Sequence, residues 1–181
     1  IITAAQEYGL ETYGVTLSEE QYAFTNQRIQ ELGLQDKVHV MLRDYRDVDM
    51  TFDYITSVGM FEHVGKENLG EYFKDVANYL VPNGRALIHG ITGQHYGAGV
   101  DPFIQKYIFP GGYIPNIAEN VTHIMEAGMQ LDDIEPLRRH YQKTLETWTE
   151  NYHAVYDKTV AERGEAFTRA WDLYLQGSAA S

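Results

Sequence analysis

The sequence predicts one α/β domain with a mostly parallel sheet that carries helices on both faces. Three observations support this prediction. Segments with strand periodicity alternate with segments of helical periodicity in the first half of the chain. The apolar, β-branched run at residues 54–58 is typical of a buried strand, and Gly59 marks its end. A chain of 181 residues with 44% hydrophobic residues can bury a sizeable core, so disorder is excluded.

The first half of the chain carries clear boundary signals. Gly9 is typical of the residue that ends an opening helix. Ser18 and Gln21 have the spacing of a capping box, which starts a helix that runs to about Leu32. Residues 82–84 (Pro-Asn-Gly) predict a turn that leads into a strand. Strands are expected over residues 12–17, 37–42, 52–58 and 86–91. Helices are expected over residues 1–8, 19–32 and 67–80.

The second half combines an aromatic segment with helices in the same domain, which we expect to span 1–181. Residues 92–115 are rich in glycine and aromatic side chains, and a loop of this length is typical of a lid or binding segment. Further elements are expected as a helix over 117–127, a strand over 129–137, and one or two long helices over 141–174 in a C-terminal helical part, 141–181. Because an α/β domain seldom begins inside a helix, we expect an N-terminal truncation that removes a strand and its loop.

Composition excludes several classes of function. The formal net charge of -12 argues against a nucleic-acid partner and gives no electrostatic attraction to anionic lipid. The chain has no cysteine, which excludes disulfides, thiolate metal sites and a cysteine nucleophile. No apolar run approaches the roughly 20 residues of a spanning helix, and no signal peptide is visible. We therefore expect a cytoplasmic protein.

Polar side chains gather at the expected carboxyl ends of the strands, where open α/β sheets bind ligands. A nucleoside needs hydrogen-bonding groups for its ribose, which Thr16 and Gln21 can supply, and a flat apolar surface for its base, which Tyr45 can supply. In chain order the four strand ends present Thr16, Leu17 and Ser18; Asp44, Tyr45 and Arg46; Gly59 to Glu62; and His89 and Ile91. Because all four ends converge on one rim of the sheet, a shared site is favoured.

Two titratable residues at this rim have alternative interpretations. Glu62 is a candidate base, or the holder of one, and the alternative is a solvated loop acid. For His89 the alternative is a core histidine with its hydrogen bonds satisfied. No histidine pair has i, i+4 spacing and the acidic residues do not cluster, so no metal site is predicted. The motifs GxSxG and GxxxxGK are also missing, which argues against a serine hydrolase and a P-loop enzyme.

Several motifs resemble those of the cyclopropane-fatty-acyl-phospholipid synthases, within the S-adenosylmethionine-dependent methyltransferases. They are residues 14–21 (GVTLSEEQ), 44–47 (DYRD), 57–65 (SVGMFEHVG), 101–112 (DPFIQKYIFPGG) and 140–145 (HYQKTL). The resemblance covers nearly the whole chain, and a generic methyltransferase would lack the Phe-Glu-His block at 61–63. It implies a Rossmann-like methyltransferase fold.

The resemblance also implies two small-molecule ligands, S-adenosylmethionine and bicarbonate. The cofactor would contact Thr16, Leu17, Gln21, Tyr45 and Arg46, and we add Ser18, Asp44 and Gly59, which stand at the same strand ends. Bicarbonate would be surrounded by Glu62, His89, Ile91 and Tyr141. The family's first glycine-rich loop and its N-terminal lipid-docking region would lie before Ile1. Ser178 stands where many relatives carry cysteine.

The implied reaction transfers a methyl group to the cis double bond of an unsaturated phospholipid acyl chain and closes a cyclopropane ring, with bicarbonate accepting the proton. The substrate implies a location peripheral to the inner face of the membrane, and a homodimer is compatible with it. Three alternatives stay open: a methyltransferase that yields methyl-branched or methylene chains, a small-molecule methyltransferase, and a non-catalytic lipid-binding fragment.

Overall fold

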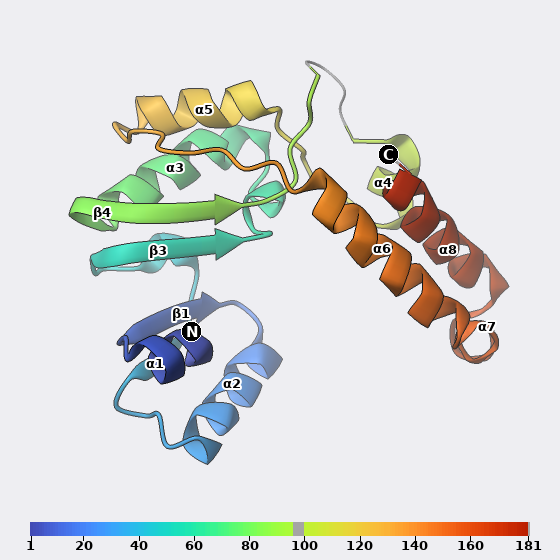
Figure 1. Cartoon of the computed structure of the whole chain (residues 1–181), viewed down its shortest axis with the longest axis horizontal. Coiled ribbons are helices and arrows are strands. Elements are labelled where there is room, and N and C mark those ends of the chain that lie inside the picture. Colours follow the sequence, from blue (N-terminus) through green and yellow to red (C-terminus); the bar gives the residue numbers. More distant parts are fainter. Residues whose placement is uncertain (96–99, 181) are drawn as a thin grey trace. The chain divides into compact units, whose positions relative to one another are not determined.

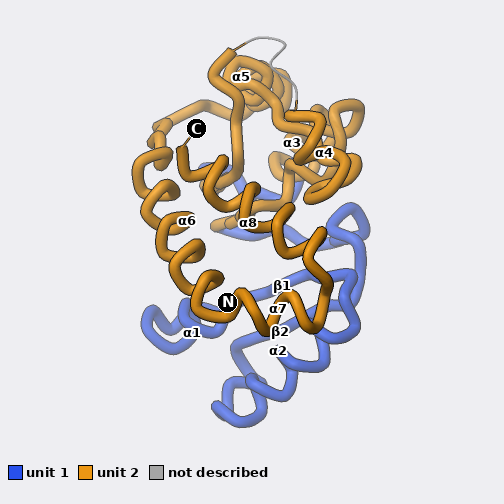
Figure 2. Tube along the Cα trace, turned by 90° about the vertical axis from the view of Figure 1, so that its right-hand side faces the viewer, with its two compact units in different colours: residues 1–53, 78–84 blue, residues 54–77, 85–181 orange. Residues whose placement is uncertain are grey.

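The computed structural model describes residues 1–95 and 100–180. The chain divides into two compact units (Figure 2). Unit 1 contains residues 1–53 and 78–84, and unit 2 contains residues 54–77 and 85–181. The chain passes from one unit to the other three times: within β3 (Phe52–Val58), at the end of α3 (Leu69–Asn78) and within β4 (Leu80–His89).

Unit 1 is a small α/β layer built from α1 (Ile2–Tyr8), β1 (Thr12–Thr16), α2 (Glu19–Glu31), β2 (Val38–Leu42) and the 3₁₀ turn η1 (Tyr45–Asp47) (Figure 1). Its core is formed by Ala5, Ile29 and Val38, each 3% exposed. Gly9 ends α1 with a left-handed φ of 69°, and Ser18 caps α2, as predicted. Local capping signals therefore located these boundaries correctly.

The two strands of unit 1 are parallel, with Thr12 opposite Val38 and Thr16 opposite Leu42. The ladder continues past the strand ends, where the Arg43 amide donates to the Thr16 carbonyl at 3.1 Å. The loops that follow β1 and β2 therefore begin side by side, as the sequence predicted.

Strands β3 and β4 form a second two-stranded sheet. The Phe52 amide donates to the Tyr79 carbonyl and the Gly59 amide to the His89 carbonyl, so these strands are also parallel. Between these bonds β3 advances by seven residues and β4 by ten. The three extra residues are 82–84, where Asn83 has a φ of 66°. The turn predicted ahead of the strand is thus corrected: it lies inside β4 as a bulge.

The prediction that β3 is a buried strand is wrong for one of its faces. Tyr54 and Val58 are 69% and 66% exposed. The opposite face is covered by α3 (Leu69–Asn78), where the Tyr72 hydroxyl donates to Ser57 Oγ at 2.7 Å. The ring of Phe73 on α3 stacks on His123 of α5 (Ile117–Glu126), so both helices lie on this side (Figure 1). In the described part of the chain, unit 2 covers one face of this sheet.

The remaining elements of unit 2 are helical. They are η2 (Phe61–His63), η3 (Lys66–Asn68), α4 (Pro102–Tyr107), α6 (Arg138–His153), α7 (Tyr156–Arg163) and α8 (Glu165–Ala180). Leu145 of α6 and Leu175 of α8 are both buried. Residues 141–174 were expected to form one or two helices, but they belong to three, α6, α7 and α8. The chain turns at Val155 and again at Gly164, which has a φ of 84°.

Two other expectations are corrected. Residues 102–107 form α4, which was not predicted, although the Asp101 cap followed by Pro102 is a standard helix start. Residues 129–137 form no strand, and residues 131–136 are exposed. Adjacent polar residues and Pro136 interrupt this stretch, and it pairs with no strand in the described part of the chain. Part of the expected 92–115 segment, residues 96–99, lies outside the described residues.

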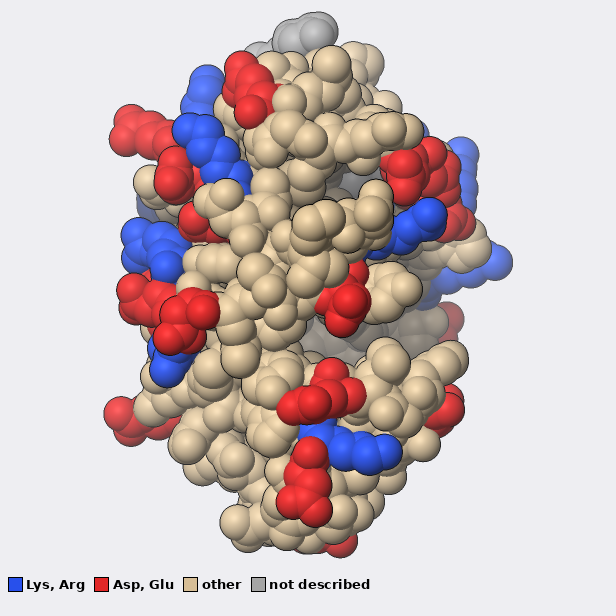
Figure 3. Space-filling model, turned by 90° about the vertical axis from the view of Figure 1, so that its left-hand side faces the viewer, with Lys and Arg blue, Asp and Glu red and all other residues tan. Residues whose placement is uncertain are grey.

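The surface carries both signs of charge. On the face drawn in Figure 3, lysine and arginine are interspersed with aspartate and glutamate. None of the described helices combines the length and the apolar character needed to span a bilayer.

Candidate active site

The first polar group of the predicted site lies in unit 1, where β1 leads into α2. Thr16 Oγ1 donates to Gln21 Oε1 at 2.8 Å and accepts from the Ser18 amide at 3.1 Å. Ser18 Oγ accepts from the Gln21 amide. The N-cap is as predicted, but the Gln21 side chain bonds Thr16 instead of closing a capping box. Leu17 stands beside these groups with 72% of its surface exposed.

The second polar group of unit 1 follows β2. Arg46 donates from Nε and from one terminal nitrogen to the two oxygens of Asp44, at 2.9 and 2.8 Å. These bonds, helped by the Arg46 amide, lower the pKa of Asp44 to about 2. Tyr45 stands between Asp44 and Arg46 in the chain. Its carbonyl accepts a hydrogen bond from the Tyr79 hydroxyl at 3.0 Å, which helps to hold it. Since Arg43 is bonded to Thr16, both groups border the same end of the β1–β2 sheet.

The acid–base group of the predicted site lies in unit 2. Glu62 Oε1 accepts from the Ile91 amide at 2.7 Å, which joins the loop after β3 to the loop after β4. His89 is the last residue of β4, and its carbonyl accepts from the Gly59 amide. The structure therefore brings Glu62, His89, Ile91 and Gly59 to one corner of unit 2, which we call the Glu62 corner.

Two polar atoms at the Glu62 corner are buried without a hydrogen-bond partner. They are Glu62 Oε2 and His89 Nδ1. Leaving such an atom unpaired costs about 1–3 kcal/mol, so a native protein normally pairs it or reserves it for a ligand. A ligand or a water molecule at each atom would supply the missing hydrogen bond.

Gly90 makes this corner compact. A Cβ atom at this position would overlap the ring of Phe61 and come within 3.0 Å of Glu62 Oε1. Phe61 is 3% exposed and has little room to move. The corner therefore requires glycine between His89 and Ile91.

Tyr141 is not among the direct contacts of Glu62 or His89 in the described structure. It lies on α6, and its ring meets Trp148 edge-on at 6.4 Å. A series of ring contacts leads from its neighbourhood to the corner. Burial raises the pKa of Tyr174, and the charge of the nearby Tyr141 phenol raises it further. The ring centroids of Tyr174 and Phe109 are 5.9 Å apart, and those of Phe109 and His63 are 6.4 Å apart. His63 is the residue after Glu62.

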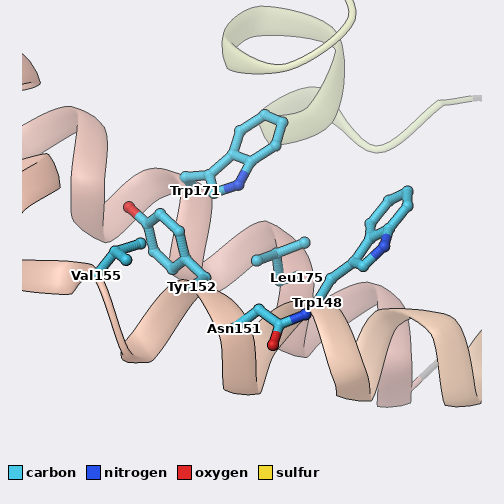
Figure 4. A pocket seen from close by; sticks show the side chains of 6 residues that line it. All are labelled: Trp148, Asn151, Tyr152, Val155, Trp171 and Leu175. Atoms are coloured by element: carbon cyan, nitrogen blue, oxygen red, sulfur yellow. The ribbon is translucent and has the colours of Figure 1, made fainter.

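The same aromatic series continues into a groove between α6 and α8. Tyr174 contacts Trp171 at 5.3 Å, and Trp171 stacks on Phe167 at 6.1 Å. The groove has a volume of about 310 Å³ and its lining side chains are drawn in Figure 4. We call it the α6–α8 groove, lined by Trp148, Asn151, Tyr152, Val155, Trp171 and Leu175. It is mainly aromatic and aliphatic, so it suits a hydrocarbon better than a polar ligand.

Comparison with known proteins decides the family. The family model described as mycolic acid cyclopropane synthetase matches residues 1–181. The chain belongs to the mycolic acid cyclopropane synthetase family. It is 42% identical over 97% of its length to a probable fatty acid methyltransferase of Pseudomonas putida. It is also 36% identical, again over 97% of its length, to the cyclopropane-fatty-acyl-phospholipid synthase of Escherichia coli K12.

Solved structures of the family confirm the predicted Rossmann-like methyltransferase fold. The cyclopropane synthase MmaA2 from Mycobacterium tuberculosis matches 98% of this chain with a TM-score of 0.86 and 28% identity. The mycolic acid cyclopropane synthase CmaA1, complexed with SAH and CTAB, matches 99% of it with a TM-score of 0.88 and 28% identity. The chain spans 46% and 44% of the two curated relatives and 67% of each of these solved chains.

Two residues that the structure connects to the Glu62 corner, Tyr113 and Glu119, were not predicted from the sequence. The Tyr113 amide donates to the Glu62 carbonyl at 3.1 Å, and the Tyr113 hydroxyl donates to Glu119 Oε1 at 2.7 Å. A local signal was available for Glu119, because Asn116 and Glu119 have capping-box spacing and form that box at the start of α5. Nothing local indicates the contact with Glu62, which lies about fifty residues earlier.

Proposed function

We propose that this chain is the catalytic part of a methyltransferase that uses S-adenosylmethionine to convert the cis double bond of an unsaturated phospholipid acyl chain into a cyclopropane ring, at a membrane surface. Bicarbonate is the proposed proton acceptor. The proposal draws on the family, on the nucleoside-type groups of unit 1, and on the two unpartnered atoms of the Glu62 corner.

The single observation that carries the acid–base part is the condition of Glu62. One carboxylate oxygen is fixed by the Ile91 amide, while the other is buried without a partner. An acceptor held in this way can take a hydrogen bond from the hydroxyl of bicarbonate, which lets two negative groups lie together. His89 Nδ1 offers a second contact, as donor or acceptor according to its tautomer.

The cofactor would be held by the residues of unit 1 that border the β1–β2 sheet. Thr16, Ser18 and Gln21 provide hydroxyl and amide groups suited to ribose, and the exposed Leu17 and the ring of Tyr45 provide apolar surface for adenine. Asp44 and Arg46 fix the loop that carries Tyr45. Gly59, which was also predicted to contact the cofactor, lies in unit 2, where its amide donates to the His89 carbonyl. When bound, S-adenosylmethionine supplies an electrophilic methyl group and bicarbonate supplies a base.

The aromatic residues of unit 2 suit the hydrocarbon part of the substrate. Addition of a methyl cation equivalent to an alkene leaves a carbocation, which water would capture. The rings of Phe109, Tyr174 and Tyr141 can exclude water and present their faces to a cation. The α6–α8 groove continues this aromatic surface, and its 310 Å³ suits a segment of an acyl chain. We place the methylene tail there, and keep Tyr141 as a proposed contact of bicarbonate together with Glu62 and His89.

The test uses the full-length gene product, methyl-labelled S-adenosylmethionine and vesicles of an unsaturated phospholipid, with fatty acids analysed by mass spectrometry. We expect a labelled cyclopropane product. Glu62→Gln should lower turnover by about 10²-fold or more, the range of general acid–base catalysis, without weakening the binding of S-adenosylhomocysteine. Tyr141→Phe should also largely abolish ring formation. Normal turnover in Glu62→Gln would remove the proposed base site, and failure to bind S-adenosylhomocysteine would favour a non-catalytic lipid-binding role.

A second candidate product is a methyl-branched or methylene chain. One observation favours it: the Pseudomonas putida relative, at 42% identity, is described as a probable fatty acid methyltransferase. Loss of the proton from a neighbouring chain carbon gives an unsaturated chain whose methyl branch keeps all three hydrogens of the transferred group, which the labelled assay detects. A cyclopropane and a methylene branch each keep two, and derivatisation of the double bond of the methylene branch before mass spectrometry separates these two products.

A further inference from the structure

Glu62 is held at both ends by two different loops of unit 2. Its side chain accepts from the Ile91 amide at 2.7 Å, and its main-chain carbonyl accepts from the Tyr113 amide at 3.1 Å. The position of the carboxylate therefore depends on where the loop after β4 and the loop before α5 lie. Neither of these two hydrogen bonds belongs to a helix or to a regular strand pair.

The two loops are bonded to one another. The Gly93 amide donates to the Pro115 carbonyl at 2.8 Å, and the Ile117 amide donates to the Gly93 carbonyl at 3.3 Å. These bonds form a short parallel bridge between Gly93 and Asn116. Pro115 is fully buried, which fixes this crossing point. Gly93 is two residues after Ile91, so the bridge also limits the movement of the amide that holds the Glu62 side chain.

The Glu119 side chain connects this bridge to Tyr113, whose amide donates to the Glu62 carbonyl. Its Oε1 accepts from the Tyr113 hydroxyl at 2.7 Å, and its Oε2 accepts from the Asn116 amide at 2.9 Å. The hydrogen bond from Tyr113 is the main reason that the pKa of Glu119 is lowered, so the carboxylate is ionised at neutral pH. Lys66 lies over the Tyr113 ring at 5.7 Å and adds a favourable charge.

We propose that Glu119 is a positioning residue for Glu62: its carboxylate joins Tyr113 and Asn116 within the loop before α5, which holds the Glu62 carbonyl directly and is bridged at Gly93 to the loop that holds the Glu62 side chain. This inference rests on the proposed function. A capping residue of purely structural value would need only the bond to Asn116. The additional bond goes to Tyr113, three residues before the cap, whose own amide donates to the Glu62 carbonyl.

The test compares Glu119→Ala, Glu119→Gln and Glu126→Ala in the full-length gene product. Glu126 is the matched control, because it is an exposed glutamate at the other end of α5 that pairs with His123 at 3.2 Å. Glu119→Ala, which removes both hydrogen bonds, should lower kcat by about tenfold to a hundredfold, since a displacement near 1 Å can cost that much. It should also raise the bicarbonate concentration needed for half-maximal rate and leave KM for S-adenosylmethionine unchanged.

Glu119→Gln should restore most of the rate, because glutamine also completes a capping box and can bond both partners. If Glu119→Ala does not fold, Tyr113→Phe removes only the bond between the two side chains and should show the same bicarbonate effect in weaker form. Wild-type kcat and bicarbonate dependence in a folded Glu119→Ala or Tyr113→Phe variant would overturn the inference. An inactive Glu62→Gln beside an unaffected Glu119→Ala would overturn it alone, whereas an active Glu62→Gln would overturn the proposed function as well.

Discussion

Replacing Gly90 with alanine tests the geometry of the Glu62 corner with a single added methyl group. Gly90 is not among the glycines with positive φ, so alanine can adopt its backbone conformation. The obstacle is space, because the new Cβ would overlap the Phe61 ring and lie 3.0 Å from Glu62 Oε1. The Phe61 ring, which is 3% exposed, must therefore move, and the Glu62 carboxylate is crowded as well.

The structure sets the size of both effects. Forcing a methyl group into a packed site usually costs about 1–3 kcal/mol, so the free energy of unfolding should fall by that amount. The packed Phe61 ring must shift to relieve the overlap, and Glu62, the next residue in the chain, should be displaced with it. A shift of about 1 Å in a catalytic group can cost about 10²-fold in rate. We therefore expect a folded protein with turnover reduced by about 10²-fold.

The assay measures product formation from labelled S-adenosylmethionine together with thermal unfolding. The control is Gly93→Ala, three residues along the same loop, where a Cβ would meet no atom closer than 3.9 Å. This variant should keep wild-type turnover and stability. A Gly90→Ala protein as active and as stable as wild type would refute the described packing of Phe61 and Glu62.

Three further predictions concern stability. Because the pKa of Asp44 falls from 3.8 to about 2 in the folded chain, its contribution is present above pH 3.8 and is lost as the pH falls toward 2. Arg46 is largely exposed, so Asp44→Asn should cost no more than about 1 kcal/mol near neutral pH and make unfolding less pH-dependent between pH 5 and 2; an unchanged pH profile would contradict this. Asn83→Ala should lower the free energy of unfolding by about 1 kcal/mol, since alanine tolerates a φ of 66° poorly, whereas Asn83→Gly should be nearly neutral in the same denaturant titration. Glu62→Gln should leave the melting temperature unchanged or higher, because the Ile91 amide keeps an acceptor and a buried charge is removed; a large drop would assign Glu62 a structural role.

Local signals predicted much of the fold because the groups that decide helix ends lie within a few residues. The Ser18 cap and the Gly9 stop are examples. Strand formation depends on distant partners, which explains the two main errors. Residues 129–137 were expected to form a strand but pair with none in the described part of the chain. The burial expected for Tyr54 and Val58 depends on what covers that face of the sheet.

The candidate site was predictable to the extent that strand ends converge. Glu62 and His89 follow parallel neighbouring strands, so their proximity followed from topology. The contacts that position Glu62 could not be predicted in this way. Ile91 acts through its main-chain amide, which carries no residue-specific signal. Tyr113 and Glu119 reach the corner only through a bridge between two irregular loops. Tyr141 was predicted through the resemblance alone, and its role in the site stays a prediction.

The energetics of the Glu62 corner argue that it is kept for a ligand. In the described part of the chain three buried side-chain atoms have no hydrogen-bond partner, and two of them, Glu62 Oε2 and His89 Nδ1, belong to this one corner. Each costs about 1–3 kcal/mol, which is a large share of the marginal stability of a domain. The cost would be avoided if Glu62 could turn toward solvent, yet two loops hold it by its side chain and by its carbonyl. The fold thus keeps two buried polar atoms without partners, at a cost in stability. A bound anion that completes their hydrogen bonds would recover this free energy on binding.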